Sequence, residues 1–313
     1  DKDAAVLQAA EGVGEVALGD PDQDASAADE ATSAESPSSG VDGGAAGDPV
    51  ATGTGTAAAT AVADEQPETK PTSNDAAAAV KEGIESDGAV LKILYATCGG
   101  AFWRMKIAWG TAAPMMAWFG IGTSSSPSSE GRISKLALPW NKLAGKIPPA
   151  IATLSALEDL VLHDNMLTGS IPPQLSKLSC LRILLLYNNK LSGGIPSDVG
   201  LLSSLRVVRL NHNELTGSIP ASIGELSCLE ELQLHNNRLS GVIPATIGKL
   251  SSIRVLSVSN NRLTGEIPAE MGQLSSLVAL ALDGNMLTGH LPAEMGRLSS
   301  LQDLRLHSNQ FKG

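Results

Sequence analysis

Short segments in which apolar and polar residues alternate recur from residue 132 to the end of the chain. Leu160 and Leu162 are two positions apart, which is the period of a β-strand with one buried face. Seven of these segments are followed by an Ile-Pro or Leu-Pro pair, where Pro ends regular pairing. The stretch after each Pro has apolar residues at helical spacing. The pattern therefore predicts a repeated unit of a short strand, a turn and a helical return.

The repeat has a constant length. An Asn follows each predicted strand, and successive Asn residues are 24 positions apart without insertion or deletion. The common pattern is LxxLxLxxNxLxGxIPxxIGxLSS. The shared residues, called the Asn ladder below, are Asn141, Asn165, Asn189, Asn213, Asn237, Asn261, Asn285 and Asn309. We interpret residues 132–313 as eight 24-residue repeats, of which the last is truncated.

One unit of this size is too small to bury its own Leu side chains. Units stacked about 4.8 Å apart form one parallel sheet and one continuous core, so the sequence predicts an α/β repeat solenoid. The Asn ladder fits this arrangement, because a side-chain amide both donates to and accepts from backbone groups of neighbouring turns. We expect its role to be structural.

The repeat resembles that of the leucine-rich-repeat (LRR) family, and the LxGxIP continuation resembles its plant-type class. This resemblance implies a right-handed superhelix with the parallel β-sheet on its concave face. In this family the concave face usually holds the ligand. The expected binding partner is therefore a protein or a peptide.

Residues 87–131 resemble the aromatic-rich N-terminal cap of plant-type LRR proteins. In such a cap a short helix and several Trp residues cover the first repeat, so we expect the aromatic residues here to be core. They are Tyr95, Phe102, Trp103, Trp109, Trp118 and Phe119. The entry into the first repeat matches at Gly131, Arg132, Ile133 and Leu136. The paired cysteines usual in plant receptor caps are absent, since Cys98 is the only cysteine in this segment.

The N-terminal segment 1–86 follows a different rule. It has eighteen acidic residues, three Lys and no Arg, a net charge of −15, and it lacks Phe, Trp and Tyr. Such a composition buries too little apolar surface to offset backbone entropy, so we expect a disordered acidic segment. Residues 87–313 have a net charge of +4, with nineteen basic and fifteen acidic residues. No strongly basic patch is evident, which argues against a nucleic-acid partner.

Several features bear on the compartment. No signal peptide is visible, no N-x-Ser/Thr sequon occurs, and residues 107–122 are too short and too rich in Gly and Pro for a transmembrane helix. Cys180 and Cys228 occupy one repeat position two units apart, about 10 Å, so we expect small buried residues without a disulfide. These features favour an intracellular location and leave a membrane-anchored parent protein open.

The predicted binding surface is the variable part of the repeat. Outward strand residues and those just after each strand differ between repeats, whereas Leu, Asn and Gly are kept. Aromatic, Arg and hydrogen-bonding side chains often carry interface energy. The candidate contacts, at the centre of the array, are Tyr187, Arg209, Asn211, His212, Gln233 and His235. His163, His235 and His307 recur every third repeat and are about 14 Å apart, too far to share a metal ion, so solvated His side chains and no metal site are expected.

No catalytic motif and no cofactor site is found in the chain. The segment Gly12 to Ala17 matches GxGxxA formally but follows no predicted strand. Two functions remain open. The first is an interaction module that binds a protein or peptide on its concave face. The second is the recognition region of a larger signalling enzyme, such as a receptor-like kinase or a repeat-bearing GTPase, whose catalytic domain lies outside this sequence.

Overall fold

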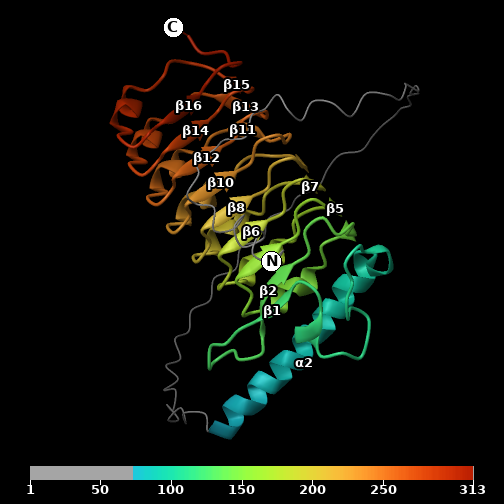
Figure 1. Ribbon diagram of the computed structural model, residues 1–313. Coiled ribbons are helices and arrows are strands. Elements are labelled where there is room, and N and C mark those ends of the chain that lie inside the picture. The colour runs from blue at the N-terminus through green and yellow to red at the C-terminus, as the bar shows by residue number, and fades with distance from the viewer. Residues whose placement is uncertain (1–72, 313) are drawn as a thin grey trace, which may run out of the picture. The chain divides into compact units, whose positions relative to one another are not determined.

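The computed structural model describes residues 73–312, and all structural statements below refer to them. Most of the segment expected to be disordered, residues 1–72, lies outside this range. Within the described residues, the repeats form an LRR solenoid in which one strand of each repeat pairs with the same strand of the next (Figure 1). The predicted fold class is confirmed.

The main sheet has nine strands, one from each of the eight repeats and one from the cap. The strands from the repeats are all parallel, and Leu160 pairs with Leu184 one repeat later, so the register follows the 24-residue period. The cap strand β1 is antiparallel to β2. In spatial order the strands are β1 (Ile121–Thr123), β2 (Ile133–Ala137), β4 (Asp159–Val161), β6 (Ile183–Leu185), β8 (Val207–Arg209), β10 (Glu231–Gln233), β12 (Val255–Ser257), β14 (Ala279–Ala281) and β16 (Asp303–Arg305).

Each of the first seven repeats continues through a short second strand and a five-residue 3-10 helix. The second strands form a four-stranded and a three-stranded sheet. These strands are β3 (Ala144–Lys146), β5 (Met166–Gly169), β7 (Lys190–Gly193), β9 (Glu214–Leu215), β11 (Ser240–Val242), β13 (Arg262–Gly265) and β15 (Met286–Leu287). The 3-10 helices are η3 (Pro149–Thr153), η4 (Pro173–Lys177), η5 (Ser197–Leu201), η6 (Ala221–Glu225), η7 (Ala245–Lys249), η8 (Ala269–Gln273) and η9 (Ala293–Arg297).

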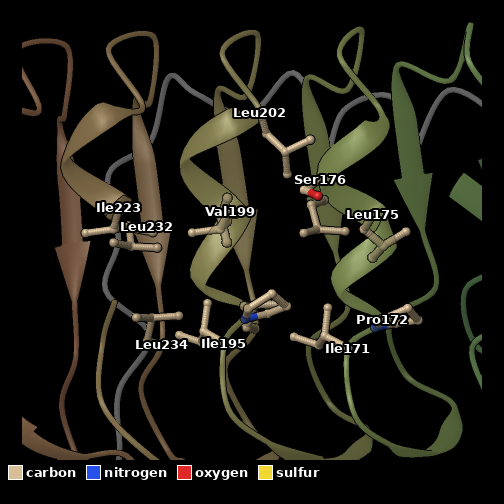
Figure 2. Close-up of a pocket in the computed structure, with 14 residues that line it drawn as sticks. Ile171, Pro172, Leu175, Ser176, Ile195, Val199, Leu202, Ile223, Leu232 and Leu234 are labelled. Carbon is tan, nitrogen blue, oxygen red and sulfur yellow. The ribbon is translucent and has the colours of Figure 1, made fainter. Parts of the chain in front are cut away.

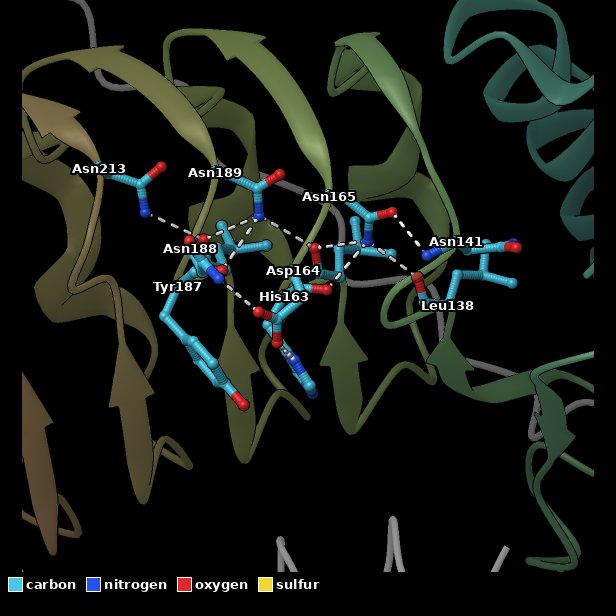
Figure 3. A network of polar contacts seen from close by, with 11 residues as sticks. Leu138, Asn141, His163, Asp164, Asn165, Tyr187, Asn188, Asn189 and Asn213 are labelled. Carbon is cyan, nitrogen blue, oxygen red and sulfur yellow. Dashed lines mark hydrogen bonds and ion pairs between the residues drawn. The ribbon is translucent and has the colours of Figure 1, made fainter. Parts of the chain in front are cut away.

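The Asn ladder joins neighbouring repeats at the turns that follow the main strands (Figure 3). The side-chain nitrogen of Asn165 donates to the carbonyl oxygens of Leu162 in its own repeat and Leu138 in the preceding one, both at 2.9 Å. Its Oδ1 accepts the amide N–H of Leu143 at 2.9 Å. Asn189, Asn213 and the later members repeat this geometry. Turn groups that would otherwise be buried without partners are thereby satisfied.

The cap begins with the helix α2 (Ser73–Thr97), which lies beside the first repeat (Figure 1). The boundary expected at residue 87 is therefore wrong, because residues 73–86 are helical. The short elements η1 (Gly100–Phe102) and η2 (Met115–Ala117) follow. The start of the helix was missed because the cap was identified by its aromatic residues, and the first turns of the helix contain none. Val90, Leu91 and Leu94, further along the helix, are buried in the core.

The aromatic residues of the cap form a tightly packed cluster over the first repeat. Trp103 lies 4.9 Å from Trp109, and Trp109 lies 4.9 Å from Trp118, between ring centroids. All three are buried, and each indole N–H donates to a backbone carbonyl. Tyr95 and Phe119 pack against them. The expectation that Phe102 belongs to this core is wrong, because 82% of its surface is exposed.

A buried ion pair ties α2 to the first repeat. Asp87 has no exposed surface, and its two carboxylate oxygens accept from Nε and Nη2 of Arg132, each at 2.8 Å. One of these oxygens also accepts the amide N–H of Ile133 at 2.9 Å. The hydrogen bond to Asp87 raises the pKa of Arg132. The cap is thus held by charge as well as by apolar packing.

Replacing Asp87 with Asn should destabilise the protein by about 3 kcal/mol, because it leaves the largely buried Arg132 without a counter-charge. Urea unfolding followed by circular dichroism measures this loss. Asp159→Asn is the matched control, since the Lys135–Asp159 pair is longer, 3.9 Å, and more exposed. It should cost less than about 1 kcal/mol. Equal losses in the two variants would refute a special role for Asp87.

The core has a small gap where the third and fourth repeats meet. A cavity of about 20 Å³ lies between β6, β8, β10 and the 3-10 helices η4 to η6, with apolar lining residues such as Val199 and Leu202 (Figure 2). Val208 lines it where the neighbouring repeats have Leu184 and Leu232, and Val199 stands where they have Leu175 and Ile223. Two missing methylene groups account for the gap.

Val208→Leu should therefore stabilise the protein by about 1 kcal/mol, close to the value of one buried methylene. Thermal unfolding measures the change. The reverse substitution in the next repeat, Leu232→Val, should cost about 1 kcal/mol. A lower melting temperature for Val208→Leu would mean that the gap does not accept the larger side chain.

Candidate functional site

We call the outward side of the main sheet, together with the turn residues that directly follow its strands, the sheet face. Arg209 lies on it because its neighbours Val208 and Leu210 point into the core. The register places Gln233 opposite Arg209. The six residues predicted as contacts, Tyr187, Arg209, Asn211, His212, Gln233 and His235, lie on three consecutive repeats of this face.

Arg209 is already paired within the protein. Its Nε and Nη2 donate to the two carboxylate oxygens of Glu231 at 2.6 and 3.0 Å. Glu231 is buried and also accepts from Nε2 of Gln233 at 2.6 Å. Burial opposes the charge of Arg209, but the hydrogen bonds and charge of Glu231 outweigh it, so the pKa is raised. Arg209 and Gln233 therefore present a fixed polar cluster instead of free side chains.

Glu231 was missed by sequence reasoning. It occupies the outward position just before the inward Leu232, a position that the search for variable residues did not include. The alternation of side chains along a strand predicts that Glu231 lies on the sheet face, because it is two residues from Gln233 and points to the same side. Its pairing with Arg209 depends on the register between strands.

His212 and His235 meet on neighbouring repeats. Their ring centroids are 5.3 Å apart, with the rings nearly perpendicular. Nδ1 of His235 is 3.1 Å from the hydroxyl of Ser257, and Asn236 contacts the ring of His212. Burial, with the nearby His212, lowers the pKa of His235 to about 4. His235 is neutral near pH 7 and is hydrogen-bonded, not a freely solvated side chain.

Lowered His pKa values make stability depend on pH. Because His235 stays neutral in the folded state while an unfolded His protonates near pH 6.5, stability is lost as the pH falls from about 6.5 towards 4. His235→Gln should reduce the difference in unfolding free energy between pH 7 and pH 4.5 by about 2 kcal/mol. Urea titrations at the two pH values measure it. The exposed His290, replaced with Gln, is the control and should leave the difference unchanged.

Trp140, His163 and Tyr187, one from each of the first three repeats, form what we call the aromatic shelf. Trp140 and His163 are edge to face at 4.7 Å, and His163 stacks on Tyr187 at 4.3 Å between ring centroids. Trp140 is 54% exposed, whereas His163 is buried between its neighbours. Figure 3 shows the rings of His163 and Tyr187 side by side on the strand side of the Asn ladder. The expectation of a solvated His163 is therefore wrong.

Polar contacts hold the shelf in place. Nδ1 of His163 is 2.6 Å from a carboxylate oxygen of Asp164, whose other oxygen accepts from Asn188. Burial lowers the pKa of His163, although Asp164 opposes this, and burial raises the pKa of Tyr187 to about 12. Both rings are uncharged near neutral pH. Next to the shelf lies an apolar strip formed by Ala137, Val161, Ile183, Leu185 and Val207.

The sheet face thus changes character along the solenoid. Its first repeats are apolar and aromatic, and the polar cluster and the two His side chains follow. Asn211, at the junction, is buried and its Oδ1 has no hydrogen-bond partner among the described residues. Within residues 73–312 there is no group of three or more His, Cys, Asp or Glu side chains arranged to hold a metal ion.

The cysteines are unpaired. Cys98 is buried, and burial raises its pKa to about 11. Cys180 and Cys228 are exposed, which corrects the expectation that they are small buried residues. Their repeat position faces outward because it follows the 3-10 helix, where the chain turns back towards the sheet. No helix among the described residues has the length and apolar character needed to cross a bilayer.

Comparisons with known proteins agree with this architecture. The family model for leucine rich repeats matches residues 203–263 and 228–287, and a second leucine-rich-repeat model matches residues 156–178 and 180–202. No curated protein matches the chain. The matched residues are all in the solenoid.

Solved structures show the same class. A pollen receptor kinase 3 is 30% identical, with coverage of 64% of this chain and 95% of that one and a TM-score of 0.56. The plant peptide hormone receptor RGFR1 in complex with RGF2 is 37% identical over 57% of this chain, with a TM-score of 0.57. A plant ice-binding protein is 26% identical, with coverage of 72% of this chain and 80% of that one and a TM-score of 0.61.

These results show the class of repeat protein to which the chain belongs. The chain belongs to the leucine-rich-repeat family, and its repeats are of the plant type. It spans only 29% of the length of the peptide hormone receptor. The ice-binding protein shows that this scaffold also serves a different function, so the site and not the fold must carry the functional argument.

Proposed function

We propose that this protein is a non-catalytic LRR module that binds a protein or peptide on its sheet face. The aromatic shelf is the observation that carries the proposal. Its three rings pack on one another outside the Leu core, and Trp140 is more than half exposed. Side chains that are costly to expose and not needed to seal the core are typical of a contact surface.

The arrangement suits an extended peptide. The shelf and the apolar strip offer contacts to apolar side chains, and the polar cluster around Arg209 and Glu231 offers hydrogen bonds beside them. An apolar anchor with polar groups next to it is the usual anatomy of a specific interface. The structure of RGFR1 in complex with RGF2 supports the choice of a peptide, because RGFR1 is a plant peptide hormone receptor and is 37% identical in its matched part.

The likeness to receptor kinases favours a second candidate. The module is then the recognition region of a larger signalling enzyme, as the matches to the peptide hormone receptor and the pollen receptor kinase suggest. The coding sequence on both sides of this chain tests it. A kinase or GTPase motif set in the same reading frame supports this candidate, and a stop codon directly after the repeats contradicts it.

The shelf gives a direct test of the first candidate. Peptides selected from a displayed random library on the intact protein should bind Trp140→Ala/Tyr187→Ala at least about 2 kcal/mol more weakly, the value expected for aromatic anchors. Titration calorimetry measures the affinity. The melting temperature should change little, because Trp140 is exposed and Tyr187 lies outside the Leu core.

Arg209→Ala/His235→Ala, on the fourth and fifth repeats, should weaken binding less, because Arg209 is already paired with Glu231. Leu201→Ala on η5 is the control for an exposed apolar residue away from the sheet face. If Leu201→Ala abolishes binding while the shelf variant retains it, the ligand lies on another face.

A further inference from the structure

The outer surface of the cap carries an apolar and cationic patch that the solenoid does not use. We call Phe102, Arg104, Met105, Lys106 and Ile107 the cap patch. Phe102 is 82% exposed, Ile107 64% and Met105 43%, although the cap's general role is to cover apolar surface. Trp103, which follows Phe102 in the same segment, is buried and anchors it.

The cap patch is held in a fixed conformation. The amide N–H of Met105 donates to Oδ1 of Asn141 at 2.6 Å, and Nδ2 of Asn141 donates to the Met105 carbonyl at 2.9 Å. Asn141 is the first member of the Asn ladder, and it binds the cap where later members bind the preceding repeat. The carbonyl of Ile107 accepts the amide of Phe119, and Lys106 donates to the carbonyl of Ala101. The exposed apolar side chains are therefore presented by an ordered backbone.

The charge around the patch has one sign. Residues 88–129 contain Lys92, Arg104 and Lys106 and no Asp or Glu. Among the described residues, none of these three cations has a carboxylate within ion-pair distance. Exposed large apolar side chains interleaved with unpaired cations match one kind of surface, the anionic membrane interface. Apolar groups enter the acyl boundary there, and cations contact the lipid phosphates.

We propose that the cap patch binds the surface of an anionic phospholipid bilayer, with Phe102, Met105 and Ile107 inserted and Arg104 and Lys106 on the headgroups. The sheet face, built from other residues, is not required for this contact. A flat protein partner fits less well, because five neighbouring exposed positions combine apolar insertion with positive charge and have no hydrogen-bonding acid or amide side chain.

Vesicle flotation with the full chain tests the proposal. The probe is a vesicle of phosphatidylcholine with about one quarter phosphatidylserine, and the reference is pure phosphatidylcholine. We expect binding to the anionic vesicles that weakens as salt is raised from about 0.1 to about 0.5 M. Phe102→Ser/Ile107→Ser and, separately, Arg104→Gln/Lys106→Gln should each weaken binding by about tenfold or more.

The matched control is Leu201→Ser/Val242→Ser, which removes two equally exposed apolar side chains from η5 and β11. It should bind vesicles as the unmodified protein does. The proposal is overturned if the unmodified protein does not prefer anionic vesicles, or if the cap variants bind like the control. It is also overturned if Phe102→Ser/Ile107→Ser shifts the melting temperature by many degrees without vesicles. That shift would show that another part of the chain, such as the acidic N-terminal segment, covers the patch.

Discussion

Each repeat can bury its Leu side chains only against the next repeat, and the rest of the structure depends on this constraint. It requires one length for every repeat, since a single inserted residue moves each inward Leu out of register with its neighbour. The pairing of Leu160 with Leu184 and the bonds of Asn165 to the preceding repeat are two results of the same 24-residue period. Apolar packing and the Asn ladder therefore reinforce one another.

The cap solves the same problem at the first repeat. Its antiparallel strand β1 covers the edge of the main sheet, and its indole rings cover the Leu core. Asp87 and Arg132 then join α2 to the start of the first repeat through a buried ion pair. Asn141 binds the cap backbone in place of a preceding repeat, so one residue type serves both kinds of junction. The ordered cap also holds its outer residues in place.

Residue types can vary at the outward strand positions, because the stacking of repeats does not constrain them. This variation is not uniform along the solenoid. The first repeats carry aromatic and apolar side chains, and the next carry a charged cluster whose members satisfy one another. A surface with an uncharged end and an internally neutralised centre favours partners that bring apolar groups. His163 and His235 on this surface are uncharged near neutral pH because burial disfavours their protonated form.

The sequence by itself determined the repeat, the solenoid and the family, because stacking needs Leu, Asn and Pro at regular spacing and such spacing is visible in one dimension. It also placed the Trp cluster and the face of Tyr187 and Arg209. Only the tertiary structure decided that Glu231 neutralises Arg209, that Phe102 is exposed and that α2 begins before Asp87. Those features arise from contacts between residues on different strands or on the cap, and no periodic pattern records which side chains will meet there.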